Sequence, residues 1–206
     1  MTKRAVPVVD LATFTRGNDE ERQAFVNRLG DAFRHIGFVT VKNHGIPKSL
    51  IDGFYALSKE FFELPESVKK KYEIEGLAGQ RGYTSFGTEH AKHSEVPDLK
   101  EFYQIGQEVT DGDPIVKEYP NNVHVEELPD FTRTAIQLYK QFEESGRNLL
   151  RAIALYLDLD EGYFDPEVHN GNSILRAIYY PPITREPQSA IRAEQHEDIN
   201  LITLLV

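Results

Sequence analysis

The sequence closes with His196-Glu-Asp-Ile-Asn-Leu-Ile-Thr-Leu-Leu-Val206, where two potential metal ligands lead into an apolar run rich in β-branched residues. Such a run favours a strand. In a strand, residues i and i+2 point to the same face, so His196 and Asp198 would project together, with Glu197 on the opposite face. An imidazole beside a carboxylate supplies two of the three ligands of the 2-His-1-carboxylate site that holds non-haem Fe(II).

The triplet His-x-Asp/Glu is weak evidence by itself. It occurs three times, as His93-Ser-Glu95, His124-Val-Glu126 and His196-Glu-Asp198, in a chain with seven His and 33 acidic residues. The first two lie in polar segments typical of loops, and only the third opens a predicted strand, where rigid ligands belong. The residues alone leave two readings open, a metal ligand and a histidine at the edge of the core.

Composition excludes several classes of protein. The formal net charge of −10 argues against binding to a nucleic-acid backbone, and Lys69-Lys70-Lys71 is best read as a solvated helix face. The chain has no apolar run of about 18 residues, and its first residues, Met1 to Pro7, lack the apolar stretch that a secretory leader would need, so we expect neither a membrane span nor a leader. It has no cysteine, so a metal would need His and carboxylate ligands. We expect a cytoplasmic protein without membrane contact.

Periodicity and caps predict the elements of the first half of the chain. Asn18 and Glu21 form a capping-box pattern at the start of a helix that ends at Gly37. The segment Gly76–Gly87 is rich in glycine and reads as a mobile loop, in which Arg81 and Tyr83 could face a pocket. The other predicted elements are strands at 6–11, 38–42 and 99–105, a helix carrying Leu50 to Phe61, and a short helix from Pro65 to Tyr72.

The second half combines one long helix with strands. An apolar stripe predicts a helix from Pro129 to about Leu157, which would pack as a scaffold against a sheet. Ser173–Pro182 reads as a strand that prolines end, and the strand from His196 follows. The pattern indicates an α+β fold, with a sheet or barrel beginning at the end of the sequence.

Several motifs, in order along the chain, resemble those of the isopenicillin N synthase-like family in the 2-oxoglutarate/Fe(II) dioxygenase superfamily. They are Phe38-Val-Thr-Val-Lys-Asn-His-Gly-Ile46, Phe61-Phe-Glu-Leu-Pro65, Arg81-Gly-Tyr-Thr with Pro97-Asp-Leu-Lys-Glu101, Leu175-Arg-Ala-Ile-Tyr-Tyr-Pro181 and His196-Glu-Asp198. The third resembles bacterial members in particular. Together they span nearly the whole chain.

The resemblance implies a double-stranded β-helix, or jelly-roll, preceded by helices. Residues 1–125 would form the N-terminal region, and 126–206 the scaffold helix and first strands of the jelly-roll. Fe(II) would be held by His196, Asp198 and a distal His, and Tyr180 would help hold 2-oxoglutarate. The family's reaction uses O2 to decarboxylate 2-oxoglutarate while a C–H bond of a small molecule is oxidised. Arg81 and Tyr83 are candidate substrate-binding residues, since an arginine can pair with a substrate carboxylate.

Two departures from the family pattern bear on these expectations. Ile178 stands where the family often has Asn, which weakens the assignment of Tyr180. Up to Val206 the sequence contains no His after His196 and no Arg-x-Ser motif, so we expect the chain to be the N-terminal portion of a longer protein and inactive alone. Three functions stay open: a 2-oxoglutarate-dependent oxygenase, an oxidase of the isopenicillin N synthase type without 2-oxoglutarate, and a non-catalytic binding module.

Overall fold

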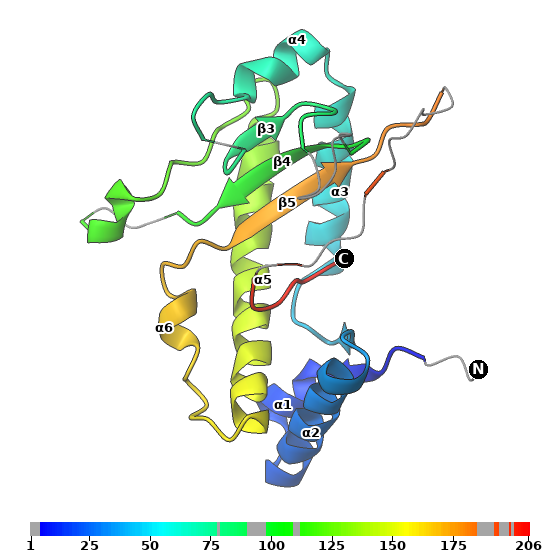
Figure 1. The fold of residues 1–206 in the computed structure, drawn as a ribbon, viewed down its shortest axis with the longest axis vertical. Coiled ribbons are helices and arrows are strands. Elements are labelled where there is room, and N and C mark those ends of the chain that lie inside the picture. The colour runs from blue at the N-terminus through cyan, green and yellow to red at the C-terminus, as the bar shows by residue number, and fades with distance from the viewer. Residues whose placement is uncertain are drawn as a thin grey trace. The chain divides into compact units, whose positions relative to one another are not determined.

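The computed structural model describes residues 5–77, 79–89, 98–108, 112–184, 192–193, 198 and 200–206 (Figure 1). These residues cluster into two units that alternate along the chain, residues 1–48 with 140–171 and residues 49–139 with 172–206. The division at residue 125 expected from the sequence stays a prediction. The elements are β1 (Val8–Asp10), α1 (Leu11–Arg16), α2 (Asp19–His35), β2 (Thr40–Lys42), α3 (Lys48–Glu63), α4 (Glu66–Lys69), the 3-10 helix η1 (Lys70–Tyr72), β3 (Gly82–Thr84), β4 (Glu101–Gly106), η2 (Pro114–Lys117), α5 (Pro129–Tyr156), α6 (Asp165–Val168) and β5 (Ile174–Tyr179).

The first unit is built around helix α2. The predicted capping box is present, because Asn18 accepts from the backbone of Glu21 while the Glu21 side chain accepts from the backbone of Asn18. At the other end, Gly37 takes a positive φ of 83° and its N–H bonds back to the last turn, as predicted for a C-terminal cap. Strands β1 and β2 pair in parallel beside it.

Helix α5 contributes its last turns to the same unit. The ring of Tyr156 lies over Gly30 of α2, where an added Cβ would come within 2.1 Å of it. The Tyr156 hydroxyl donates to Asp31 at 3.0 Å. Gly30 is therefore a contact point between the two helices. The bounds of α5 confirm the predicted long helix.

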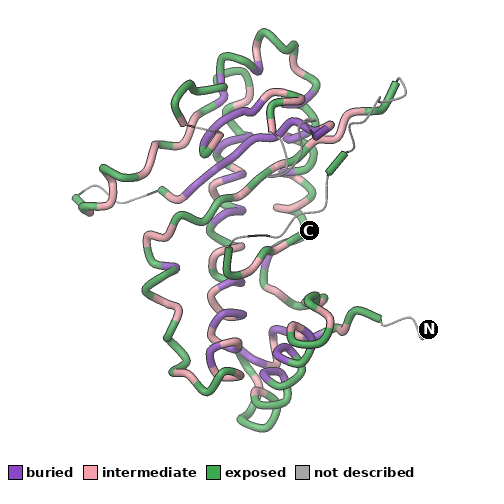
Figure 2. Tube along the Cα trace, in the orientation of Figure 1, coloured by how far each residue is buried: buried purple, intermediate pink, exposed green. Residues whose placement is uncertain are grey.

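The second unit holds the antiparallel sheet β3-β4-β5. Tyr83 pairs with Tyr103, and Tyr103 with Ala177, so these residues share one face of the sheet. That face packs on α3 and the first turns of α5, which lie behind the sheet in Figure 1. Phe61 of α3 is fully buried, with its ring 5.0 Å from those of both Tyr103 and Phe131. β4 is buried along its whole length (Figure 2).

Two elements differ from the predictions. Helix α1 was not expected; it begins because the Asp10 side chain accepts from the backbone of Ala12 at the end of β1. The Gly76–Gly87 segment was expected to be a mobile loop, but its residues 82–84 form β3. Three residues carry too little local signal for a strand, and pairing with β4 supplies the backbone partners.

Candidate metal and cosubstrate site

The predicted metal ligands come from the end of the sequence. His196 and Glu197 lie outside the described residues, so only Asp198 can be placed. Asp198 is exposed, and its Oδ2 accepts a hydrogen bond from the Thr203 hydroxyl at 2.5 Å. In the parts of the chain that the structure describes, no group of three or more His, Asp or Glu side chains is placed to hold a metal ion.

The predicted strand at this end is not formed by its described residues. Asn200 donates to the backbone of Ile202 at 2.6 Å, and the Tyr55 hydroxyl donates to the backbone of Val206 at 2.5 Å. Leu201 and Leu205 are exposed. A strand needs a neighbour that accepts its backbone hydrogen bonds, and these residues bond to side chains and to near neighbours instead. The strand prediction is therefore wrong for residues 200–206, and its first residues, 196, 197 and 199, lie outside the described residues.

Tyr180 is the first residue after β5. It is half-buried, and the two prolines that follow cannot donate to a sheet, which ends the strand as predicted. β5 runs antiparallel to β4, with Ile178 opposite Phe102 and Arg176 opposite Gln104. Tyr180 therefore follows a strand that is fixed in register along six residues.

Arg81 is fully buried, just before β3. Its Nη1 donates to the backbone oxygen of Gln80 at 2.8 Å, while Nε and Nη2 have no hydrogen-bond partner among the described residues. Burial lowers the pKa of this guanidinium. The group lies against Gly106, where an added Cβ would come within 1.8 Å of Cζ. Arg81 is thus a buried cation with two unused donors.

Tyr83 is also buried, and its hydroxyl makes a short hydrogen bond to Glu101. The same carboxylate forms an ion pair of 2.7 Å with Lys69, whose ammonium group also donates to Phe62. Burial raises the pKa of Tyr83, and the hydrogen bond to Glu101 raises it further. Lys69 was expected on a solvated face, and that expectation is wrong. The Lys69 side chain is buried because its ammonium group pairs with the buried carboxylate of Glu101. Lys70 and Lys71 are exposed as predicted.

Sequence reasoning missed Arg176. It lies on β5 with its guanidinium carbon 4.3 Å from the centre of the Phe102 ring, and it forms an ion pair with Glu89. The alternation of β5 could have placed Arg176 on one face with Ile178. The partners come from segments some 70 residues or more away and carried no local signal.

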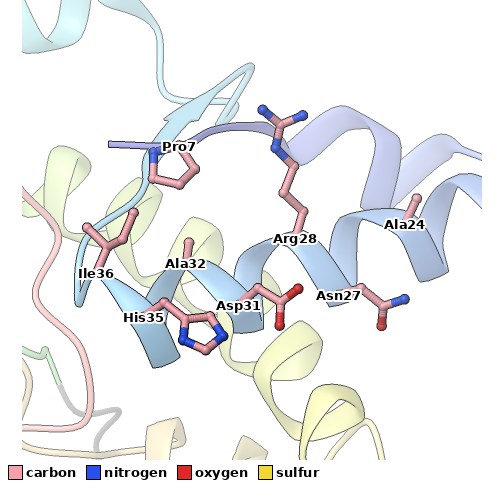
Figure 3. Close-up of a pocket in the computed structure, with 8 residues that line it drawn as sticks. All are labelled: Pro7, Ala24, Asn27, Arg28, Asp31, Ala32, His35 and Ile36. Carbon is pink, nitrogen blue, oxygen red and sulfur yellow. The ribbon is translucent and has the colours of Figure 1, made fainter. Parts of the chain in front are cut away.

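Two open surface pockets lie in the first unit. One, of about 510 Å³, lies along α2 near Pro7, with Asp31 and His35 among its lining residues (Figure 3). None of the predicted site residues lines it. No helix in the described ranges is long and apolar enough to cross a bilayer.

Comparison with known families decides the membership of the chain. Residues 6–127 match the family of the N-terminal region of non-haem dioxygenases in morphine synthesis. The chain belongs to the 2-oxoglutarate/Fe(II) dioxygenase superfamily. The resemblance inferred from the motifs is confirmed, and the match covers helices α1 to α4 and strands β1 to β4.

Individual dioxygenases match nearly the whole chain. The 2-oxoglutarate-Fe(II) type oxidoreductase ppzD of Metarhizium rileyi is 31% identical over 98% of this chain and 60% of its own length. The proline hydroxylase buaE of Petromyces alliaceus is 32% identical over 96% of this chain and 62% of its own. The chain therefore spans about three fifths of these curated relatives.

Solved structures confirm the α+β fold of this superfamily. A 2OG-Fe(II) oxygenase family protein from Caulobacter crescentus shares 34% identity with a TM-score of 0.82, over 95% of this chain and 62% of its own. A full-length protein from Neurospora crassa, crystallised with alpha-KG and thymine, shares 27% identity with a TM-score of 0.77, over 94% of this chain and 62% of its own.

Proposed function

We propose that the protein is a non-haem Fe(II) oxygenase that couples decarboxylation of 2-oxoglutarate to oxidation of a small-molecule C–H bond. The observation that carries the proposal is the match to 2-oxoglutarate-Fe(II) type enzymes over almost the whole chain. The names of these relatives favour this reaction over an oxidase that does not consume 2-oxoglutarate. Succinate formation separates the two, because only the first releases it.

His196 and Asp198 are the proposed metal ligands in this chain. An imidazole nitrogen with a carboxylate oxygen is the donor set that non-haem Fe(II) takes, so these residue types fit the group. The hydrogen bond from Thr203 gives the Asp198 carboxylate a partner that can orient it, as partners of metal-bound carboxylates do. When bound, Fe(II) would supply open coordination positions for 2-oxoglutarate and O2.

Tyr180 is the proposed cosubstrate residue. It follows β5, whose register with β4 fixes the position of its backbone, and its half-buried side chain could donate a hydrogen bond to a carboxylate of 2-oxoglutarate. Replacing Tyr180 by Phe removes that donor and keeps the ring. We expect a raised KM for 2-oxoglutarate, and an unchanged KM would withdraw the assignment.

Arg81 and Tyr83 stay candidate substrate residues. Within the part of the chain that the structure describes, two guanidinium nitrogens of Arg81 have no hydrogen-bond partner and could receive an anionic group, although the side chain is buried. The hydroxyl of Tyr83 is already bonded to Glu101, which leaves its ring as the part able to contact a substrate. If Arg81→Met left the substrate KM unchanged, the role of Arg81 would be structural.

The proposed ligand class is small molecules, and the proposed location is the cytoplasm. The net charge of −10 supports a protein that does not bind nucleic acid. The sequence also offers no apolar span for a bilayer.

Metal binding tests the ligand assignment directly. The full-length product of the gene is titrated anaerobically with Fe(II) in a calorimeter. We expect one ion per chain for the wild type and for Asp160→Ala, which removes an exposed carboxylate elsewhere, and no tight binding for Asp198→Ala. Stoichiometric binding by Asp198→Ala would remove Asp198 from the site.

A further inference from the structure

The face of the sheet opposite α3 and α5 carries Arg176. Neighbouring residues on a strand point to opposite faces, and Ala177 pairs with Tyr103 on the face that packs against the helices. Arg176 therefore points away from α3 and α5, together with its partners Gln104 and Phe102. In Figure 1 this face of β5 is turned toward the viewer.

The guanidinium of Arg176 is held in one plane by partners along its edges. The amide of Gln104, oriented with Oε1 toward Arg176, accepts from Nη2 at 2.7 Å and from Nε at 2.9 Å. The nitrogen of the same amide then donates to the backbone oxygen of Gly79 at 2.7 Å. Glu89 accepts from Nη1 at 3.1 and 3.3 Å. Each of the three guanidinium nitrogens thereby has a hydrogen-bond partner.

One flat side of this group rests on a ring, since its carbon lies 4.3 Å from the centroid of Phe102. The Phe102 ring is buried, yet 36% of the Arg176 side chain is exposed. Because the edges and one side are covered, the exposed part includes the opposite flat side. We call Arg176 with Phe102, Gln104 and Glu89 the Arg176 plate.

The charge of the plate is compensated. Glu89 also accepts an ion pair of 2.7 Å from Lys100, and Lys100 pairs with Asp98 at 2.8 Å. Two cations and two carboxylates thus alternate along one network. A substrate carboxylate would find no free fork of donors and no net positive charge on the plate, so pairing with an anion is disfavoured.

Along β5 the plate is flanked by two exposed apolar side chains. Ile174 and Ile178 lie two residues to either side of Arg176 on the same strand face, and 38% and 44% of their surfaces are exposed. A planar guanidinium stacks well on flat π systems, and its weak hydration favours such contacts over full solvation. The chemistry that matches this surface is a flat, uncharged ring.

We propose that the Arg176 plate determines substrate specificity by stacking against a planar aromatic or heteroaromatic ring of the substrate. The inference rests on the proposed oxygenase function, because it names the class of substrate that the oxygenase would bind. The proposed binding surface lies on β5, the strand that Tyr180 follows. It assigns Arg176 a binding role, with no part in the chemistry at the metal.

The test compares flat rings with saturated rings that carry the same polar groups. Thymine is paired with dihydrothymine, and benzamide with cyclohexanecarboxamide, in calorimetric titrations of the protein as its own gene encodes it. We expect the wild type to bind at least one flat member about tenfold more tightly than its saturated partner, in the range of a cation–π contact. If neither flat ring is preferred, the proposal is overturned, and this comparison needs no variant.

Two variants locate the preference. Arg176→Lys keeps the charge and loses the plane, so we expect the ratio of the two affinities to fall to about threefold or less. Arg133→Lys makes the same exchange at an exposed position of α5 and should keep the full ratio. A full ratio in Arg176→Lys overturns the proposal. Arg176→Gln serves as the second variant if the lysine protein does not fold.

A second readout separates this inference from the proposed function. The wild type is assayed for succinate formed from 2-oxoglutarate and O2 without added substrate, with ascorbate present to supply the two electrons that a substrate would otherwise give. If the wild type forms succinate but shows no preference for flat rings, only the proposed binding role of the Arg176 plate is overturned. Absence of succinate counts against the oxygenase itself, and with it against the substrate class proposed here.

Discussion

The Arg81 side chain fits beside residue 106 only because that residue is glycine. The buried guanidinium occupies the space beside Gly106 that any larger residue would need. Gly106 also uses its backbone N–H and oxygen to bond the side-chain amide of Asn122, at 2.8 and 2.9 Å. Gly106 is therefore fixed by hydrogen bonds to Asn122, and the Arg81 guanidinium fills the space where a side chain would lie.

Gly106→Ala should destabilise the protein. The new methyl group would lie within 2.3 Å of three guanidinium atoms, and overpacking of this kind costs about 1–3 kcal/mol. Gly53→Ala is the matched control, because nothing lies within 4 Å of its Cβ position in α3, and there alanine should stabilise the helix. Urea unfolding followed by circular dichroism measures both, and equal effects would contradict the crowding.

Arg81→Met should raise the free energy of unfolding. The variant removes a buried cation with two unpartnered nitrogens and fills the space with an apolar chain, and such exchanges at buried ionic sites often stabilise by about 1–4 kcal/mol. A lower midpoint of thermal unfolding would mean that Arg81 contributes more through its bond to Gln80 than its burial costs.

At the scale of elements, helix α2 depends on its caps. Asn18→Ala removes one half of the capping box and should cost about 1 kcal/mol. Asn27→Ala changes the same residue type at an exposed position within α2, where alanine favours the helix. Chemical unfolding of both variants tests the prediction, which fails if Asn18→Ala is as stable as the wild type.

Local signals predicted the long elements well. The capping pattern at Asn18 and the apolar stripe from Pro129 are complete within one segment, so α2 and α5 could be read directly. Strand β3 and the burial of Lys69 depend on β4, which is distant in sequence. The His-x-Asp pattern was recognisable as a ligand pair, but the conformation of the described residues from 198 to 206 was not, because a strand exists only with its partner.

At the scale of the whole molecule, the free energy of unfolding should depend on pH because the Glu127 carboxylate titrates. A hydrogen bond from Tyr72 and then an ion pair with Lys71 lower the pKa of Glu127 from its ordinary value of 4.5 to about 2. A lowered pKa in the folded state gives stability that is present above pH 4.5 and is lost as the pH falls toward 2.

Glu127→Gln should therefore be less stable than the wild type at neutral pH, with the difference shrinking between pH 4.5 and about 2. Thermal unfolding midpoints across this range measure it. Glu60→Gln removes the same charge from an exposed position of α3 and should show no comparable change. A difference that is constant with pH would contradict the proposed cause.

The central claim is that the protein consumes 2-oxoglutarate with a metal held by His196 and Asp198. The most direct measurement is succinate formed when the protein encoded by its own gene is given Fe(II), O2, 2-oxoglutarate and ascorbate, which supplies the two electrons that a substrate would otherwise give, with Asp198→Ala and Asp160→Ala alongside. The account predicts succinate from the wild type and from Asp160→Ala, and none above background from Asp198→Ala. Absence of succinate from the wild type, or equal amounts from Asp198→Ala, would contradict it.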